Sequence, residues 1–325
     1  MNPTPLPPDL PPSMSRARFL RLAAASAAGL VIGAPARATP ASAATTLTRP
    51  TPTMHTRPIP VTGEPLPVIG CGTYIGFDVA RDSEQYQRLP DVLQALFGAG
   101  GAVIDSSPMY GRAEAVTGAL LAAAGSHDKA FVATKVWTRG RAEGIRQMEE
   151  SLRRLQVERL DLMQVHNLVD WQTQLATLRD WKAAGRVRYL GVTHYTAGAY
   201  DALEAVMRAE RLDFLQINYS LDEREAERRI LPLAAERGMA VLINRPFGGG
   251  GLLRRLRERP LPPWAADIGA TSWAQLLLKF VLAHPAVSCA IPGTSRPEHM
   301  ADNALAGIGE IPDKSFWERH SLTLT

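Results

Sequence analysis

Cysteine is scarce in this sequence, and neither cysteine has a partner at a recognisable spacing. Only Cys71 and Cys289 occur among the 325 residues, and neither belongs to a C-x-x-C pair or has a histidine beside it. This pattern argues against a disulfide framework and against the common zinc motifs. We therefore expect both cysteines to be small buried apolar residues.

The sequence also lacks a strong excess of charge of either sign. Its formal net charge is +4, while 46% of the residues are apolar and 21% are charged. Residues 1–43 contain four arginines against one aspartate, which leaves about +1 for the rest of the chain. These values are typical of a soluble globular protein with a sizeable core, and they do not indicate a nucleic-acid partner.

No apolar run is long enough to span a bilayer. The run at 22–34 is apolar or small, follows the basic segment Ser-Arg-Ala-Arg-Phe-Leu-Arg at 15–21, and precedes small-x-small sites that end at Ala38 and Ala43. This order is typical of a signal peptide. The basic segment resembles a twin-arginine signal in which Ala17 replaces the second arginine.

The chain is therefore predicted to have three parts. We expect a signal peptide over 1–43, a disordered linker over 44–56 and one folded domain over 57–325. The predicted location is the bacterial periplasm. The alternative interpretation is an N-terminus that stays disordered and unprocessed.

From residue 57 onward, short apolar runs alternate with amphipathic helical patterns. A hairpin is expected at 57–67, because Thr62, Gly63 and Glu64 separate two extended pieces. Eight further runs follow, at 68–73, 102–106, 131–136, 160–166, 189–193, 214–218, 240–244 and 288–291. Segments such as 143–155 and 272–283 show apolar residues at helical spacing. The predicted fold class is α/β, a (β/α)8 TIM barrel with an N-terminal β-hairpin.

Polar side chains follow three of these runs at the end where such barrels hold their active sites. Asp105 and then Tyr110 follow the second run, Lys135 lies near the end of the third, and His166 closes the fourth. Each residue alone has an ordinary structural explanation. Their joint placement at successive strand ends favours a site.

The spacing of these residues resembles that of the aldo-keto reductase family. Its members show Asp-x-x-x-x-Tyr-Gly, then Thr-Lys, then a histidine that closes the fourth strand, and here these motifs occupy 105–111, 134–135 and 166. The resemblance extends over about residues 57–310. It implies reversible hydride transfer from NADPH to the carbonyl of an aldehyde or ketone. The implied catalytic residues are Asp105, Tyr110, Lys135 and His166.

The chemistry gives each of these four residue types a role. Hydride delivery builds negative charge on the carbonyl oxygen, which needs a proton donor, and a phenol has an ordinary pKa of about 10. We expect the ammonium of Lys135 to lower the pKa of Tyr110, and Asp105 to fix the charge and position of Lys135. His166 is expected to orient the carbonyl oxygen through a hydrogen bond.

The resemblance also implies a cofactor groove over the remaining strand ends. His194 and Gln216 stand where family members bind the carboxamide, although His194 replaces the usual asparagine, and Asn244 replaces a tyrosine that often stacks on the nicotinamide. The predicted cofactor-binding residues are Gly72, Thr73, Thr193, His194, Gln216, Asn244, Arg245, Pro246, Phe247, Gly248, Thr294, Ser295, Arg296, His299 and Asn303.

Two segments are expected to contact phosphates. The four glycines at 248–251 either approach a pyrophosphate through their N–H groups or form a flexible loop. The segment 291–303 resembles the family's adenosine-binding signature, in which Arg296 favours a bound phosphate. Gly293 and His299 replace cations that are common in the family. We predict NADP as the cofactor, with NAD as the alternative.

Apolar side chains are expected to line the substrate pocket. Tyr74, Met109 and Trp137 are the predicted walls, with Trp171 as a further candidate, and they suit a carbonyl compound with a hydrophobic body. Phe316, together with Trp317, is a candidate flap over the pocket. The small-molecule substrate itself and the oligomeric state are left open.

Two other classes of protein are less consistent with the sequence. A doubly wound dinucleotide fold lacks its G-x-G-x-x-G fingerprint here, and a metal-dependent hydrolase lacks a constellation of metal ligands. The alternative that stays open is a nicotinamide-binding redox sensor or regulatory subunit with little turnover. The β subunits of potassium channels, which resemble aldo-keto reductases, are of this kind.

Overall fold

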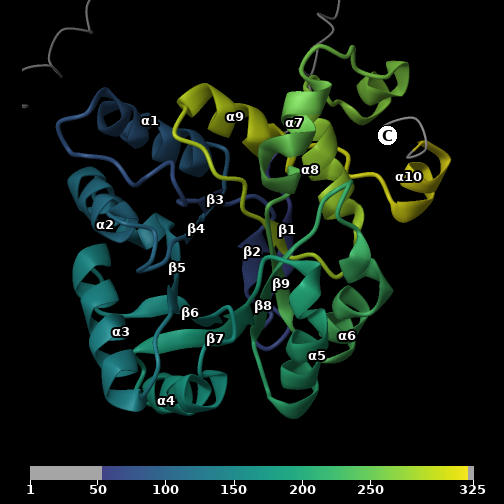
Figure 1. The fold of residues 1–325 in the computed structure, drawn as a ribbon. Coiled ribbons are helices and arrows are strands. Elements are labelled where there is room, and N and C mark those ends of the chain that lie inside the picture. Colours follow the sequence, from purple (N-terminus) through teal and green to yellow (C-terminus); the bar gives the residue numbers. More distant parts are fainter. Residues whose placement is uncertain (1–52, 321–325) are drawn as a thin grey trace, which may run out of the picture. The chain divides into compact units, whose positions relative to one another are not determined.

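The computed structural model describes residues 53–320, which form a parallel barrel surrounded by helices (Figure 1). The eight strands follow one another around the sheet in chain order, and each neighbouring pair is parallel. They are β3 (Cys71–Gly72), β4 (Val103–Asp105), β5 (Phe131–Val136), β6 (Leu160–His166), β7 (Val187–Thr193), β8 (Phe214–Asn218), β9 (Ala240–Asn244) and β10 (Cys289–Ala290). The predicted (β/α)8 TIM barrel is confirmed.

Helices connect the strands and cover the outside of the barrel (Figure 1). Serine side chains begin two of them, since Ser83 accepts the N–H of Tyr86 and Ser272 accepts the N–H of Gln275. The helices are α1 (Glu84–Gly98), α2 (Ala113–Ala124), α3 (Arg141–Leu155), α4 (Trp171–Ala183), α5 (Tyr200–Ala209), α6 (Ile230–Glu236), α7 (Gly251–Leu256), α8 (Trp273–Ala283), α9 (Pro297–Leu305) and α10 (Lys314–His320).

The first and last strands close the barrel through single bridges instead of a continuous ladder. Ile69 pairs with Ala290 and Gly72 pairs with Gly293, both in parallel. A Cβ atom on Gly72 would lie 2.9 Å from the carbonyl oxygen of Ile291, so a side chain at this position would force the two strands apart. Because the pairing here is discontinuous, β3 and β10 are shorter than the predicted runs.

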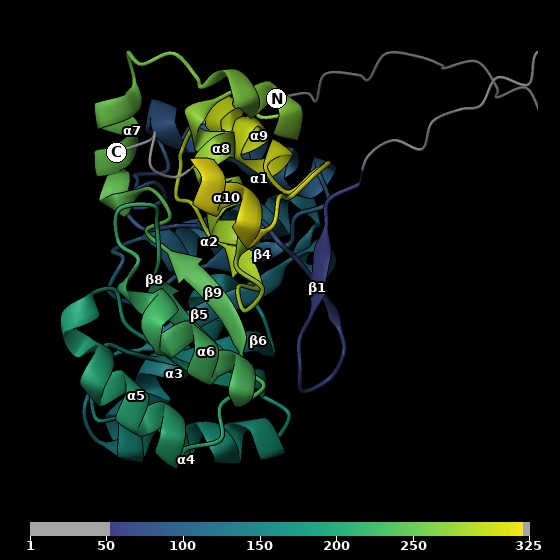
Figure 2. The same ribbon diagram turned by 90° about the vertical axis from the view of Figure 1, so that its right-hand side faces the viewer.

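The predicted hairpin is also present, and it plugs one end of the barrel. β1 (Thr56–Pro58) pairs antiparallel with β2 (Pro65–Pro67), and the hairpin is seen from the side in Figure 2. Ile59 and Leu66 are buried in a cluster with residues from the amino-terminal halves of the strands, such as Phe131. The carboxyl ends of the strands are therefore the end that the hairpin leaves free for a site.

The described residues test only part of the predicted division of the chain. The predicted signal peptide, 1–43, lies outside the described residues, as does most of the predicted linker, 44–56. Packing begins before the predicted domain start, because Met54 is buried and β1 begins at Thr56. Within residues 53–320, no helix is long and apolar enough to cross a membrane.

The two cysteines are buried and free, as expected. Burial raises the pKa of the Cys71 thiol to about 12 and also raises that of Cys289, so both stay protonated at neutral pH. In the part of the chain that the structure describes, no group of three or more histidine, cysteine or acidic side chains could hold a metal ion.

Candidate active site

A buried ion pair lies at the carboxyl end of the barrel. The Nζ atom of Lys135, at the end of β5, donates to Oδ2 of Asp105, at the end of β4, over 2.6 Å, and to the carbonyl oxygen of Ser106 over 2.6 Å. The side chain of Lys135 is fully buried and that of Asp105 is 4% exposed. Two neighbouring parallel strands bring the two residues together because their carboxyl ends meet at one rim.

Tyr110 lies over this ion pair. The Nζ atom of Lys135 is 4.9 Å from the centroid of the Tyr110 ring, and that ring meets the His166 ring edge-on at 6.0 Å between centroids. The turn after β4 places Tyr110 there, since its N–H donates to the carbonyl oxygen of Ser107 over 3.0 Å. The structure thus brings all four predicted catalytic side chains into one cluster.

The pKa of Tyr110 corrects one expectation. Burial raises this pKa and outweighs the opposing effect of the Lys135 ammonium, so the pKa lies above its ordinary value instead of below it. Burial alone would lower the pKa of Lys135, but the Asp105 carboxylate, with a smaller contribution from the hydroxyl oxygen of Tyr110, raises it, so Lys135 remains charged. In the protein alone, Tyr110 is therefore a protonated phenol at neutral pH beside a fixed positive charge.

His166 is neutral and has a defined hydrogen bond on one side of its ring. Burial, helped by the charge of Lys135, lowers the pKa of His166 to about 3. Its Nδ1 atom lies 3.1 Å from Oγ of Ser107, which in turn accepts the N–H of Met109 over 3.4 Å. Because the Ser107 oxygen accepts the N–H of Met109, the hydroxyl group of Ser107 can donate its own hydrogen to Nδ1 of His166. This arrangement favours the tautomer with hydrogen on Nε2.

Sequence reasoning missed two residues of this cluster. Ser107 lies in the loop after β4, and its contact with His166 depends on the path of that loop. Gln164 donates through Nε2 to Oδ1 of Asp105 over 3.3 Å. A signal for Gln164 was available, because it stands two positions before His166 on one strand and so faces the same side.

An amide network extends from the ion pair to β9. Gln216 donates through Nε2 to Oδ1 of Asp105 over 2.8 Å, and its Oε1 atom accepts from Oγ1 of Thr193 over 3.2 Å and from Nδ2 of Asn244 over 3.4 Å. The Nδ2 atom of Asn244 also donates to the carbonyl oxygen of His194 over 3.1 Å. Four predicted cofactor residues, Thr193, His194, Gln216 and Asn244, are thus joined to Asp105 in one chain of hydrogen bonds.

Three amide oxygens at this end of the barrel are buried and have no hydrogen-bond partner in the described part of the chain. They belong to Gln164, Asn167 and Asn244, and each follows or lies within β6 or β9 near its carboxyl end. A buried acceptor without a donor costs free energy, so these oxygens can accept hydrogen bonds from a bound group that carries N–H donors. A carboxamide is a ligand of this kind.

His194 and Tyr195 form a stacked pair after β7. Their ring centroids are 5.5 Å apart with an angle of 5° between the planes, and 45% of Tyr195 is exposed. Burial lowers the pKa of His194, so its imidazole is neutral at neutral pH. Its Nδ1 atom accepts the N–H of Thr196 over 3.4 Å.

The glycine segment after β9 has a defined conformation that ion pairs hold in place. Gly248 has φ +56°, and a Cβ atom there would lie 2.7 Å from Oδ1 of Asp222, so the position requires glycine. Arg245 pairs with Glu223 at 3.1 Å, and Arg255 pairs with Asp222 at 2.8 Å. Of the other predicted cofactor residues here, Phe247 is buried and Pro246 lies between it and Arg245.

The amino end of α9 is open for an anion. Arg296 is the residue that caps α9, its side chain makes no capping hydrogen bond, and it is exposed without an ion pair among the described residues. Its N–H donates to Oγ1 of Thr294 over 3.1 Å, and Ser295 lies between the two. His299 is exposed one turn further on, whereas Asn303 is buried on the same helix. Gly72 and Thr73 lie on the neighbouring strand end.

Exposed aromatic side chains surround the cluster. Tyr74, 61% exposed, lies 5.0 Å from the Tyr110 ring, and Trp137, 41% exposed, lies 6.5 Å from the His166 ring. Met109 is 40% exposed in the turn before Tyr110. The structure places these three predicted pocket residues next to the cluster or in the turn before Tyr110, and their role as pocket walls stays a prediction.

Two other predicted contacts have different surroundings. Trp171 begins α4 and packs against the hydrophobic core. The prediction that Trp317 forms part of a flap over the pocket is wrong. Trp317 is buried on α10, and its ring centroid lies 5.4 Å from that of Phe280 on α8. Phe316 packs 5.5 Å from Trp264. Both side chains stabilise the packing of α10, because these contacts remove their apolar surface from water.

Comparisons with known proteins agree with this fold and this site. The model of the aldo/keto reductase family matches residues 68–321. Methylglyoxal reductase YeaE of Escherichia coli is 30% identical over 246 residues, which cover 74% of this chain and 84% of the relative. An aldo-keto reductase of Klebsiella pneumoniae, solved with NADPH, is 30% identical with a TM-score of 0.66, covering 78% of this chain and 90% of that one. The structure of aldo-keto reductase AKR11C1 of Bacillus halodurans is 21% identical with a TM-score of 0.67. The match covers 84% of this chain and 96% of the AKR11C1 chain, and it shows the shared fold.

The chain belongs to the aldo/keto reductase family. It is accordingly an NAD(P)H-dependent oxidoreductase.

Proposed function

We propose that the protein uses NADPH to reduce the carbonyl group of an aldehyde or ketone, reversibly. The observation that carries this proposal is the buried pair of Lys135 and Asp105 beneath a protonated Tyr110, with a neutral His166 at its edge. This arrangement offers one proton donor and one hydrogen-bond donor to a single oxygen atom. Family membership supports the assignment, and so does the NADPH complex of the Klebsiella relative.

The four side chains divide the work on the carbonyl oxygen. A bound reduced nicotinamide supplies the hydride. His166 donates from Nε2 to the carbonyl oxygen and orients it. Tyr110 gives its phenolic proton to that oxygen as negative charge develops, and the fixed charge of Lys135 stabilises the resulting phenolate. Asp105 keeps Lys135 charged and in place, because burial alone would lower the pKa of Lys135.

The residues present fit a nicotinamide cofactor. The unpartnered oxygens of Asn167 and Asn244 are suited to a carboxamide NH2 group, and Gln216 and Thr193 belong to the same network. Asn244 has no aromatic face, so it takes part through hydrogen bonds and does not stack on the nicotinamide ring. The defined glycine segment at 248–250 is proposed to approach the pyrophosphate.

The open end of α9 supports NADP in preference to NAD. A 2′-phosphate at this end would meet the helix dipole and the free guanidinium of Arg296. We expect NADPH to bind more tightly than NADH, and Arg296→Gln to weaken NADPH binding roughly tenfold while NADH binding changes little. Titration followed by nicotinamide fluorescence measures both affinities. Arg211→Gln, an exposed arginine before β8, is the matched control. Equal affinity of the natural protein for NADPH and NADH would refute the preference.

The walls around Tyr110 and His166 support a substrate with an apolar body. Tyr74 and Trp137 offer aromatic faces on two sides of the cluster. The E. coli relative is named for methylglyoxal, a small ketoaldehyde. The carbonyl compounds to be tested as substrates of this protein therefore include both methylglyoxal and aromatic aldehydes.

Export to the periplasm is also part of the proposal. The basic segment at 15–21 and the apolar run at 22–34 support it. In a bacterial host we expect a chain cleaved near Ala43 in the periplasmic fraction, and retention of the full chain in the cytoplasm after Arg16→Gln and Arg18→Gln. Cytoplasmic location of the unaltered full-length chain would contradict export.

A further inference from the structure

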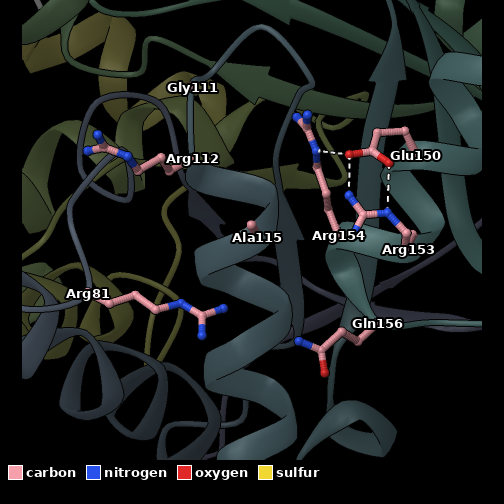
Figure 3. Close-up of a pocket in the computed structure, with 8 residues that line it drawn as sticks. All are labelled: Arg81, Gly111, Arg112, Ala115, Glu150, Arg153, Arg154 and Gln156. Atoms are coloured by element: carbon pink, nitrogen blue, oxygen red, sulfur yellow. Dashed lines mark hydrogen bonds and ion pairs between the residues drawn. The ribbon is translucent and has the colours of Figure 1, made fainter.

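A basic pocket lies between α2 and α3, next to the loop that precedes α1 (Figure 3). Its volume is about 340 Å³, which is within the range of small-molecule sites. Four arginines line it: Arg81, Arg112, Arg153 and Arg154. None of them belongs to the active-site cluster or to the predicted cofactor groove.

Two of these arginines share one carboxylate. Arg153 donates to both oxygens of Glu150, and Nε of Arg154 donates to Oε1 of the same residue over 2.6 Å. Hydrogen bonds from Arg153 and Arg154 lower the pKa of Glu150 to about 2, so this carboxylate is ionised at neutral pH. Two guanidinium groups thus compete for a single negative charge.

The second acidic neighbour of Arg154, Glu114, neutralises the charge of its guanidinium group only weakly. Its Nη1 atom is 4.0 Å from Oε2 of Glu114, and burial raises the pKa of that carboxyl group. The Oε2 atom of Glu114 is buried without a hydrogen-bond partner. The distance is too long for a hydrogen bond, so this contact adds little to the neutralisation of Arg154.

The other two arginines have no acidic partner among residues 53–320. Within the described residues, neither Arg81 nor Arg112 makes an ion pair or a side-chain hydrogen bond, although the backbone N–H of Arg112 donates to Asp78 over 2.9 Å. Four guanidinium groups against Glu150 leave three positive charges in the lining. The chain outside residues 1–43 has a net charge of only about +1. The three surplus positive charges of the pocket therefore exceed the net charge of that whole part of the chain.

Figure 3 shows how these side chains are disposed. Arg81 points toward Ala115 on α2 from one side, and Arg153 and Arg154 lie with Glu150 on the other side. Arg112 stands beside Gly111 at the edge, with its guanidinium group turned outward. An anion on this face of α2 would lie between cations from both sides, and Arg112 can rotate toward it because its side chain is exposed.

We propose that this pocket binds a small polyanion whose charge is carried on phosphate or carboxylate oxygens. The guanidinium fork matches either group with two parallel hydrogen bonds, and the surplus of three charges suits a ligand with two or three negative charges. The site is separate from the cofactor groove, so it does not depend on the proposed reaction.

Calorimetric titration of the full chain with inorganic pyrophosphate tests the site, with citrate as the carboxylate probe. NADP is kept saturating, so that phosphate sites in the cofactor groove are filled. The test variant is Arg81→Gln/Arg112→Gln, which removes the two unpaired guanidinium groups without breaking an ion pair. The matched control is Arg211→Gln/Arg228→Gln, which removes two exposed arginines that also lack an ion pair with any residue of 53–320. Arg296→Gln reports on the cofactor groove.

We expect one site for either probe, weakened roughly tenfold to a hundredfold in the pocket variant and unchanged in the other two. An equal loss in the pocket variant and the matched control would show unspecific attraction and overturn the proposal. Loss only in Arg296→Gln would place the anion in the cofactor groove, which also overturns it. Absence of binding by both probes has the same consequence. Correct folding of each variant is checked by thermal unfolding, and that of the pocket variant and the matched control also by NADPH affinity.

Discussion

Tyr110→Phe is expected to lower the rate of carbonyl reduction on the order of a thousandfold, while the affinity for NADPH changes little. The variant removes only the phenolic oxygen, which is the proposed proton donor, and leaves the ring that packs beside Lys135 and His166. Single-turnover kinetics at saturating NADPH measure the rate of the chemical step directly.

The control for this variant is Tyr86→Phe, which removes a hydroxyl group from α1 away from the barrel rim. We expect that control to reduce carbonyl compounds at the natural rate. Near-normal turnover in Tyr110→Phe would refute the role of Tyr110. A parallel loss of NADPH affinity would show that the substitution disturbs the cofactor site instead.

Lys135→Met is expected to cost both activity and stability. It leaves the carboxylate of Asp105 buried without its cation, a change that typically lowers the free energy of unfolding by about 3–5 kcal/mol. Lys314→Met removes a cation from an exposed pair with Glu318 on α10, for which a loss below about 1 kcal/mol is expected. Urea unfolding compares the two variants.

A double variant separates the buried charge from the loss of packing. In Asp105→Asn/Lys135→Met the uncompensated carboxylate is gone, so we expect part of the stability lost in Lys135→Met to return while activity stays low. Equal destabilisation by Lys135→Met and Lys314→Met would contradict the stabilising role of the buried pair of Lys135 and Asp105.

Much of the fold was predictable because the apolar runs are buried on both faces. For β5, β6, β8 and β9 the predicted and observed bounds agree, and β6, β8 and β9 each end on a polar residue. β3 and β10 were overestimated, because single bridges close the barrel and the sequence carries no sign of where a ladder stops. The hairpin was predictable from its turn residues.

The positions of the catalytic side chains were predictable for a related reason. Asp105, Lys135 and His166 stand at strand ends, so the topology alone brings them together. The pKa of Tyr110 was not predictable, because the sequence gives the charge of Lys135 but not the extent of burial, which has the larger effect. The contact of Ser107 with His166 depends on the path of one loop.

The arginine pocket lay beyond sequence reasoning altogether. Arg81 lies in the loop before α1 and Arg153 lies on α3, far apart in the chain, and no local pattern links them. The packing of α2 against α3 and the path of the loop before α1 together place them around one space.

The most direct test of carbonyl reduction is the oxidation of NADPH by the purified protein in the presence of methylglyoxal and aromatic aldehydes. We expect saturable oxidation of NADPH with at least one of these compounds, with one alcohol formed per NADPH consumed and with Tyr110→Phe close to the background rate. Tight binding of NADPH without oxidation across the panel would contradict the proposed reaction, and it would favour a nicotinamide-binding sensor built on the same barrel.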